Sequence, residues 1–439
     1  MLHTEYRPAR KALFVAALLV AVPNLSHAEG LTSIYEKARS SDPQFQQAIA
    51  DRNAREEALP QARAGLKPGA TLSSSFDGID NRNTDDQYQE LSYGISLSQS
   101  LYDYSQRQVV DQADAQVSQA RAEFSFAEQE LILRVAERYF AVLDAREALD
   151  AAEANLEAIR RQLDQAEQRF EVGVIARTDV EEARAQADLA RAERLQAEDD
   201  LESRREELRE ITNQAPAELN AVRVGVDLAP PEPQEPAAWR ERAEEENRQL
   251  AAARFAAQAA LENVDVQRGG RMPNADLVAG FNRSHEYGRT GPETEVDQMS
   301  AGLEVNFPFY QGGEISANIR EAQFRYTEAR ESLEETRRTV ARNAADAYRG
   351  VQTALERVQA LDQARTSTQA ALEATEAGFE VGTRTIVDVL NAQRELFNAE
   401  RDYEQARHAY LINTLRLRQA AGTLTEADLE RVNALLTDD

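Results

Sequence analysis

The chain has 439 residues and a formal net charge of −27, because 77 acidic side chains outnumber 50 basic ones. This acidity argues against a nucleic-acid-binding protein, which needs a basic face to neutralise phosphates. The chain contains no cysteine, which excludes disulfides, thiol catalysis, thiolate metal sites and a lipid-modified N-terminal cysteine. Its mean hydropathy of −0.60 leaves no room for several membrane helices.

Residues 1–28 have the pattern of a secretory signal peptide. Basic residues precede an apolar run over residues 12–22, and Ser26 and Ala28 supply the small residues of a cleavage site. The apolar run is shorter than the ~18 residues that a membrane helix needs. A buried N-terminal helix is the alternative interpretation. We therefore predict an exported protein.

The rest of the chain repeats itself at an offset of 209 residues. The sequence FEVG that starts at Phe170 recurs at Phe379, and Asp179 recurs as Asp388. Glycines and prolines also match in order, which indicates a duplicated unit rather than chance similarity among helices. The predicted division is a first repeat over 29–213, a proline-rich equatorial connector over 214–237, a second repeat over 238–422 and a C-terminal equatorial segment over 423–439.

Each repeat is expected to run in the order helix, two strands, long helix, turn, second helix. Apolar residues at alternating three- and four-residue steps form a heptad stripe along each long helix. The two long helices contain no proline, and each would span roughly 100 Å at 1.5 Å per residue. The predicted helices are 31–66 and 238–271, with further helices over about 105–171, 177–213, 314–380 and 384–422, and the predicted strands cover about 69–80, 88–104, 275–287 and 296–310.

The predicted strands are amphipathic. Leu91, Tyr93, Ile95 and Leu97 alternate with small polar residues, which gives the strand one apolar and one polar face. The apolar face would cover a core in a soluble protein, or would face lipid in an outer-membrane barrel. Four strands cannot close a barrel, because about eight are the minimum. A membrane-spanning sheet therefore requires oligomerisation, since an open edge is not tolerated in lipid.

These features resemble the TolC family of outer-membrane channels over nearly all of the chain after residue 28. The matching stretches include RQLDQAEQRFEVGVIARTDVEEARAQ at the first helical turn, NFPFYQGGEISANIREAQ after the fourth strand and AGFEVGTRTIVDVLNAQRELFNAERDYEQARHAYLINTLRLRQAAGTLTEADL near the end. The resemblance implies a mainly α protein with a membrane β-barrel. It would form a homotrimer with a twelve-strand barrel among outer-membrane lipid of a Gram-negative cell and a twelve-helix tunnel in the periplasm.

The resemblance also implies a function and its partners. The expected protein is a passive conduit without a cofactor, which exports drugs, other small molecules or secreted proteins. It would open when a periplasmic membrane-fusion adaptor and an inner-membrane transporter of the RND, ABC or MFS type dock.

Two positions resemble the ring that lines the periplasmic entrance in this family. Asp388 falls where the family has an aspartate, and threefold symmetry would place three carboxylates around a narrow pore. Asn391 replaces a second ring aspartate, which predicts a less negative entrance. Glu182, the repeat partner of Asn391, is a further candidate for a charge in the lumen. Ordinary solvated helical charges are the alternative for these residues.

Other positions resemble the contacts that hold the entrance closed and the surfaces that receive the adaptor. Arg384 matches the arginine of the closed-state latch, and its expected partners are Thr178 and Asp179 in the first turn. Phe379 replaces a tyrosine, so the latch would lack one hydroxyl. The helix tips at Gly173 and Gly382 are the expected docking points of the adaptor. A plain C-cap glycine is the alternative interpretation at both positions.

Two other classes of protein fit the sequence less well. Two histidines after residue 28, no cysteine and no glycine-rich phosphate loop leave little material for an enzyme or a zinc site. A soluble periplasmic coiled-coil adaptor or scaffold would have one helical hairpin and would lack duplicated amphipathic strands. The sequence therefore favours the channel.

Overall fold

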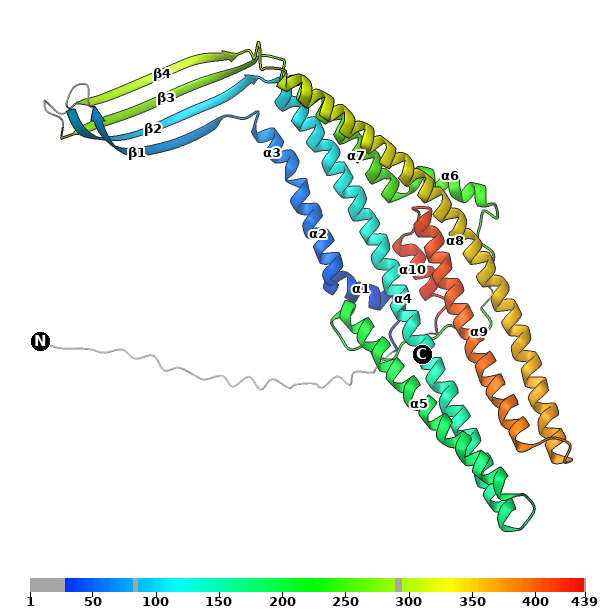
Figure 1. The fold of residues 1–439 in the computed structure, drawn as a ribbon. Coiled ribbons are helices and arrows are strands. Elements are labelled where there is room, and N and C mark those ends of the chain that lie inside the picture. Colours follow the sequence, from blue (N-terminus) through cyan, green and yellow to red (C-terminus); the bar gives the residue numbers. More distant parts are fainter. Residues whose placement is uncertain (1–27, 82–85, 227, 289–293, 438–439) are drawn as a thin grey trace, which may run out of the picture.

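The computed structural model describes residues 28–81, 86–226, 228–288 and 294–437. The molecule is elongated, with a four-stranded sheet at one end and two helical hairpins that reach to the other end (Figure 1). Almost all of the predicted signal peptide, residues 1–27, lies outside the described residues.

Two long helices run the length of the helical part. Helix α4 spans Tyr104–Glu171 and helix α8 spans Glu314–Glu380, with 68 and 67 residues. Asp103 begins α4, because its carboxylate accepts a hydrogen bond from the Gln106 backbone N–H at 2.9 Å. The heptad stripe is buried along both helices, as at Val135 in α4 and Val351 in α8.

The helix predicted over 31–66 is wrong, because the structure breaks it into three. These are α1 (Leu31–Ser41), α2 (Pro43–Glu56) and α3 (Ala58–Ala64). Asp42 is extended because the proline that follows it disfavours helical geometry. The Asp42 carboxylate then accepts a hydrogen bond from the Gln44 N–H and so caps α2.

The helix predicted over 238–271 is also wrong. It is divided into α6 (Pro236–Glu246) and α7 (Arg248–Gly269). Asn247 is extended, and its side-chain oxygen accepts a hydrogen bond from the Leu250 N–H at 3.1 Å. Asparagine is a strong N-cap, so it ends one helix and starts the next.

The return helices complete two hairpins. Helix α5 (Arg177–Thr212) packs against α4, and helix α9 (Ile386–Ala420) packs against α8. We call α4 with α5 the first hairpin and α8 with α9 the second hairpin. The helix predicted from about residue 384 begins at Ile386, because Thr385 is its N-cap. The short helix α10 (Glu426–Asn433) follows within the C-terminal segment.

The sheet is an open antiparallel meander of β1 (Gly69–Asn81), β2 (Asp86–Tyr102), β3 (Asn274–Tyr287) and β4 (Glu295–Asn306). The predicted end of the second strand at residue 104 is wrong, since Asp103 already caps α4. The predicted end of the fourth strand at residue 310 is wrong as well. Pro308 lacks the N–H that would continue the ladder.

The register separates an apolar from a polar face. Leu72 pairs with Ile95, Ile95 with Phe281, and Phe281 with Met299. The neighbouring row across the four strands is polar or small and consists of Thr71, Ser96, Gly280 and Ser300. Paired residues of an antiparallel sheet share a face, so one face is apolar and the other polar. The apolar face is open to its surroundings, with Leu72 78% and Met299 84% exposed.

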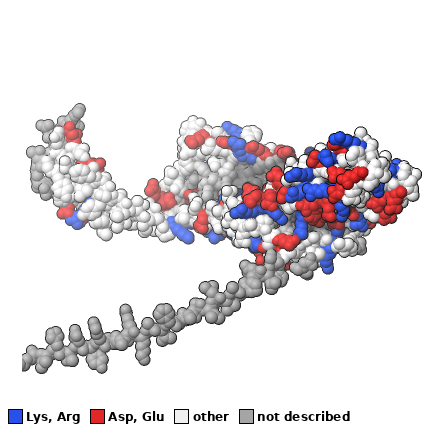
Figure 2. Space-filling model, turned by 90° about the horizontal axis from the view of Figure 1, so that it is seen from below, with Lys and Arg blue, Asp and Glu red and all other residues white. Residues whose placement is uncertain are grey.

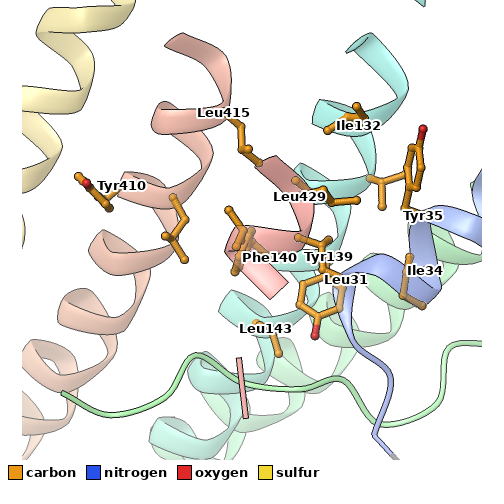
Figure 3. Close-up of a cluster of buried hydrophobic side chains, with 14 of the residues drawn as sticks. Leu31, Ile34, Tyr35, Ile132, Tyr139, Phe140, Leu143, Tyr410, Leu415 and Leu429 are labelled. Atoms are coloured by element: carbon orange, nitrogen blue, oxygen red, sulfur yellow. The ribbon is translucent and has the colours of Figure 1, made fainter. Parts of the chain in front are cut away.

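A hydrophobic core lies midway along the helices, where Glu29 pairs with Leu219 of the connector and Leu436 pairs with Val222 of the connector. Figure 3 shows Leu31 of α1 beside Tyr139 and Phe140 of α4, with Leu429 of α10 close by. All four side chains are buried, and burying one such side chain contributes about 1.5–3 kcal/mol. We call this cluster the equatorial core.

Side-chain donors hold the irregular connector onto this core. The Tyr139 hydroxyl donates to the Asn220 carbonyl oxygen at 2.7 Å and to the Glu29 carbonyl oxygen at 3.0 Å. Tyr348 and Tyr410 donate to other carbonyl oxygens of the connector. A segment without regular ladders needs such partners for its buried carbonyls.

Candidate functional site

The candidate site lies at the two hairpin tips, at the opposite end of the molecule from the sheet (Figure 1). We call residues 172–176, between α4 and α5, the first tip, and residues 381–385, between α8 and α9, the second tip. Gly173 has φ +77° and Gly382 has φ +78°, a left-handed conformation that side chains disfavour. Each glycine therefore ends its long helix and lets the chain reverse.

Both tips present apolar side chains beside these glycines. Val172 and Val381 are each 75% exposed, and Val174 of the first tip is 70% exposed. Nothing lies within 4 Å of the point where a side chain at either glycine would begin. The tips are thus small, open and partly apolar.

Asp388 forms a capping box at the start of α9. Its Oδ2 accepts hydrogen bonds from the Thr385 backbone N–H at 2.8 Å and from the Thr385 hydroxyl at 2.9 Å. These bonds, together with the nearby charge of Arg384, hold the pKa of the Asp388 carboxyl below its usual range. The side chain is therefore an anion at neutral pH.

Asn391 lies three residues after Asp388, on the same side of α9. It is exposed, and its Oδ1 accepts a hydrogen bond from an Arg394 guanidinium nitrogen at 3.1 Å. Glu182 is an exposed residue near the start of α5. Its position in the lumen stays a prediction.

The predicted latch residues do not meet within one described protomer. The Thr178 hydroxyl donates to the Asp179 carboxylate at 3.5 Å, within the first turn of α5. Arg384 instead packs on its own tip, where its backbone N–H donates to the Gly378 carbonyl oxygen at 3.2 Å. No hydrogen bond or ion pair among the described residues joins Arg384 to the first tip.

A residue that sequence reasoning missed joins the two hairpins beside their tips. The guanidinium carbon of Arg169, in the last turn of α4, lies 4.8 Å from the centroid of the Phe379 ring in α8. The only sequence signal was a basic residue at the end of a helix, which is common there. The partner could not be identified without placing the two hairpins.

A second group that sequence reasoning missed lies between α4 and α9 near the equatorial core. His408 Nδ1 lies 2.6 Å from an Asp144 carboxylate oxygen, and the His408 side chain is 3% exposed. Burial raises the pKa of the nearby Glu147 carboxyl, and the negative charges of Glu404 and Asp150 raise it further. These contacts link the two hairpins above their tips.

Charge is distributed unequally along the molecule. Figure 2 shows acidic and basic side chains crowded over the helical part, whereas the sheet end is mostly uncharged. No helix in the described part of the chain combines the length and the hydrophobicity that a membrane crossing requires. An exposed amphipathic sheet on a charged, elongated helical bundle is typical of a protomer whose sheet joins those of other copies to form a closed barrel.

Comparison with known proteins gives the family. The model of the family described as Outer membrane efflux protein matches residues 34–214 and 239–423. Outer membrane protein TolC of Vibrio cholerae serotype O1 is 37% identical over 429 residues, covering 96% of this chain and 97% of the relative. Alkaline protease secretion protein AprF of Pseudomonas aeruginosa is 29% identical over 435 residues, covering 95% of this chain and 89% of that protein.

The fold has solved relatives too. The Campylobacter jejuni CmeC outer membrane channel superimposes with a TM-score of 0.76 at 15% identity, covering 93% of this chain and 90% of that one. The chain therefore belongs to the outer membrane efflux protein family and is an outer-membrane export channel of the TolC type.

These matches confirm the predicted fold class, a duplicated, mainly helical protomer of the trimeric channel architecture, and its outer-membrane location. The relatives reported above are named as an outer membrane protein, a secretion protein and an outer membrane channel, and none of these names is that of an enzyme. The alternative of a soluble adaptor or scaffold gains no support from them.

Proposed function

We propose that three copies of the chain form a conduit with a gate, and that the hairpin tips form this gate. The observation that supports this most strongly is the open sheet, which has unpaired edges at β1 and β4 and a continuous exposed apolar face. Three such sheets supply twelve strands, enough to close a barrel around an aqueous lumen. The hairpins then lie side by side as a twelve-helix tunnel in the periplasm.

The start of α9, directly after the second tip, forms the constriction in this proposal. Asp388 is ionised, so three copies around the axis make a ring that attracts cations. Asn391 adds no charge one turn further on, and Glu182 is the candidate for an additional lumen carboxylate. A pore of this kind selects for cations without a bound cofactor.

The closed state is held by contacts between the tips. Arg384 makes no ion pair within its described protomer, so a neighbouring protomer can supply Thr178 and Asp179 as its partners. Phe379 cannot donate a hydrogen bond, and its share of the latch is therefore apolar. Opening requires that these contacts break together.

The tips also receive the partners. Small residues at Gly173 and Gly382, flanked by exposed valines, leave room for the hairpin ends of a periplasmic membrane-fusion adaptor. The adaptor connects the channel to an inner-membrane RND, ABC or MFS transporter, which supplies the energy, and the chain itself catalyses no reaction. Both small molecules and secreted proteins are proposed cargo, and the name of the AprF relative supports the second class.

The test combines cross-linking with deletion. Cross-linked complexes purified from cells through this chain are expected to contain an adaptor and an inner-membrane transporter, and Gly382→Asp is expected to reduce their recovery. Deletion strains compared for drug susceptibility and secreted proteins would then identify the cargo. Recovery of the chain as a salt-released periplasmic species without a transporter would contradict the proposal.

A further inference from the structure

Two kinds of contact connect the first hairpin to the second near their tips: Ile386 packs against the buried cluster of Ala166, Val180 and Ala183, and an arginine lies over a phenylalanine ring. Arg169 belongs to the last turn of α4, and Phe379 belongs to the last turn of α8. The guanidinium carbon lies 4.8 Å from the ring centroid, within the range of a cation–π interaction. The contact therefore joins α4 of the first hairpin to α8 of the second hairpin, which no hairpin turn connects.

Phe379 is held firmly within the second hairpin. Its ring packs against a small cluster in which Val389 is 1% exposed and Leu372 is 7% exposed. Because this cluster joins α8 to α9, the ring cannot shift without disturbing the second hairpin. A displacement of the first hairpin relative to the second would therefore separate Arg169 from this ring.

The duplicated sequence does not produce this contact twice. The repeat counterpart of Phe379 is Phe170, which is 43% exposed. The repeat counterpart of Arg169 is Gly378, which has no side chain, and a Cβ there would meet Arg384 Cγ at 2.8 Å. The two tips are consequently different. An arginine faces a ring at positions 169 and 379, but the repeat counterparts of these positions, 378 and 170, carry a glycine and a phenylalanine.

We propose that Arg169 is a positioning residue of the closed tip, which holds the first hairpin against the second through the face of Phe379. This role rests on the proposed function of the tips as the gate. A phenylalanine ring offers a π-face but no hydroxyl, and a guanidinium stacks well on such a face. The contact thus provides a connection within the protomer that needs no hydrogen bond from residue 379.

The test is a double-mutant cycle read in single-channel recordings. Arg169→Met keeps the length of the side chain and removes its charge, whereas Phe379→Leu keeps the apolar packing and removes the ring. Each is expected to raise the open-to-closed ratio roughly twofold to fivefold per contact, and about ten- to hundredfold if three protomers open together. The double variant should open no more than either single variant, because both remove the same contact.

Conservative and matched variants separate this role from a general structural effect. Phe379→Tyr keeps the ring face, so it should not open more than wild type, and Arg169→Lys should fall between wild type and Arg169→Met, since an ammonium stacks less well. Arg161→Met is the matched control, because Arg161 lies on the same helix and pairs with Glu157 of that helix at 3.1 Å. Unchanged opening in both Arg169→Met and Phe379→Leu, or additive effects in the double variant, would overturn the proposal.

Hydrogen exchange gives a reading that does not depend on conductance. In purified trimers, Arg169→Met is expected to accelerate amide exchange at both tips, although the substitution lies only in the first hairpin. Faster exchange confined to the first tip would overturn the proposed connection. If wild type conducts no ions at all, the proposed function fails, and the exchange result still decides the role of Arg169.

Discussion

Asp388 performs two tasks, and they can be separated by substitution. Its charge contributes to the proposed entrance ring, and its Oδ2 caps α9 through two hydrogen bonds from Thr385. Asp388→Ala would remove both. Asp388→Asn removes the charge alone, because an amide oxygen can accept the same two hydrogen bonds.

The expected effect is a loss of block by multivalent cations. Because the pKa of Asp388 is lowered, the carboxylate is ionised at neutral pH. Asp388→Asn therefore removes three negative charges from each trimer. A divalent cation about 6 Å from three carboxylates in 0.1 M salt would bind roughly ten- to fiftyfold more tightly than at an uncharged ring. Asp388→Asn should therefore weaken block by about this factor in planar-bilayer recordings.

Thr385→Ala is the matched control. It removes the hydroxyl of the capping box and costs the helix about 1 kcal/mol, but it leaves the carboxylate ionised. Block should stay close to that of wild type. Equal block in Asp388→Asn and wild type would refute a carboxylate ring in the cation path, and an equal loss in Thr385→Ala would assign the effect to the cap.

Three further predictions follow from the latch, the connector and the buried acid. Arg384→Ser should raise the resting conductance, and a closed-state current equal to wild type would count against the latch. Tyr139→Phe removes the donor to the Asn220 carbonyl and should lower the free energy of unfolding by about 1–3 kcal/mol, measured by thermal denaturation of the trimer. Burial and the charge of Glu404 raise the pKa of Glu147 above 4.5, so the folded state binds this proton more tightly than the unfolded state. Stability should fall as pH rises from 4.5 through the folded pKa, and Glu147→Gln should flatten this part of the melting-temperature profile.

The sequence predicts the long elements well, because their signal is repeated many times. A heptad stripe without proline defines α4 and α8, and alternation of apolar and polar residues defines β2 and β4, and β3 less cleanly. The shorter helices were predicted as continuous, although Pro43 already disfavours a helical conformation at Asp42. Asn247 gives a weaker signal, since an asparagine ends a helix only when its side chain can reach the next turn.

Some residues of the candidate site can likewise be predicted from the sequence, and others cannot. Positions defined by local chemistry, such as the left-handed glycines of the tips and the Thr385–Asp388 pattern, can be read from sequence. The contact between Arg169 and Phe379 cannot, because these residues lie on different hairpins far apart in the chain. The pairing of His408 with Asp144 is hidden for the same reason, since it depends on how α4 and α9 pack.

The most direct test of a conduit formed by three shared sheets is recording from the protein, purified from membranes, in a planar lipid bilayer. Detergent-extracted trimers should insert in discrete, long-lived steps of small, cation-selective conductance. A detergent-extracted protein that remains monomeric and produces no conductance steps would contradict a conduit formed by three shared sheets.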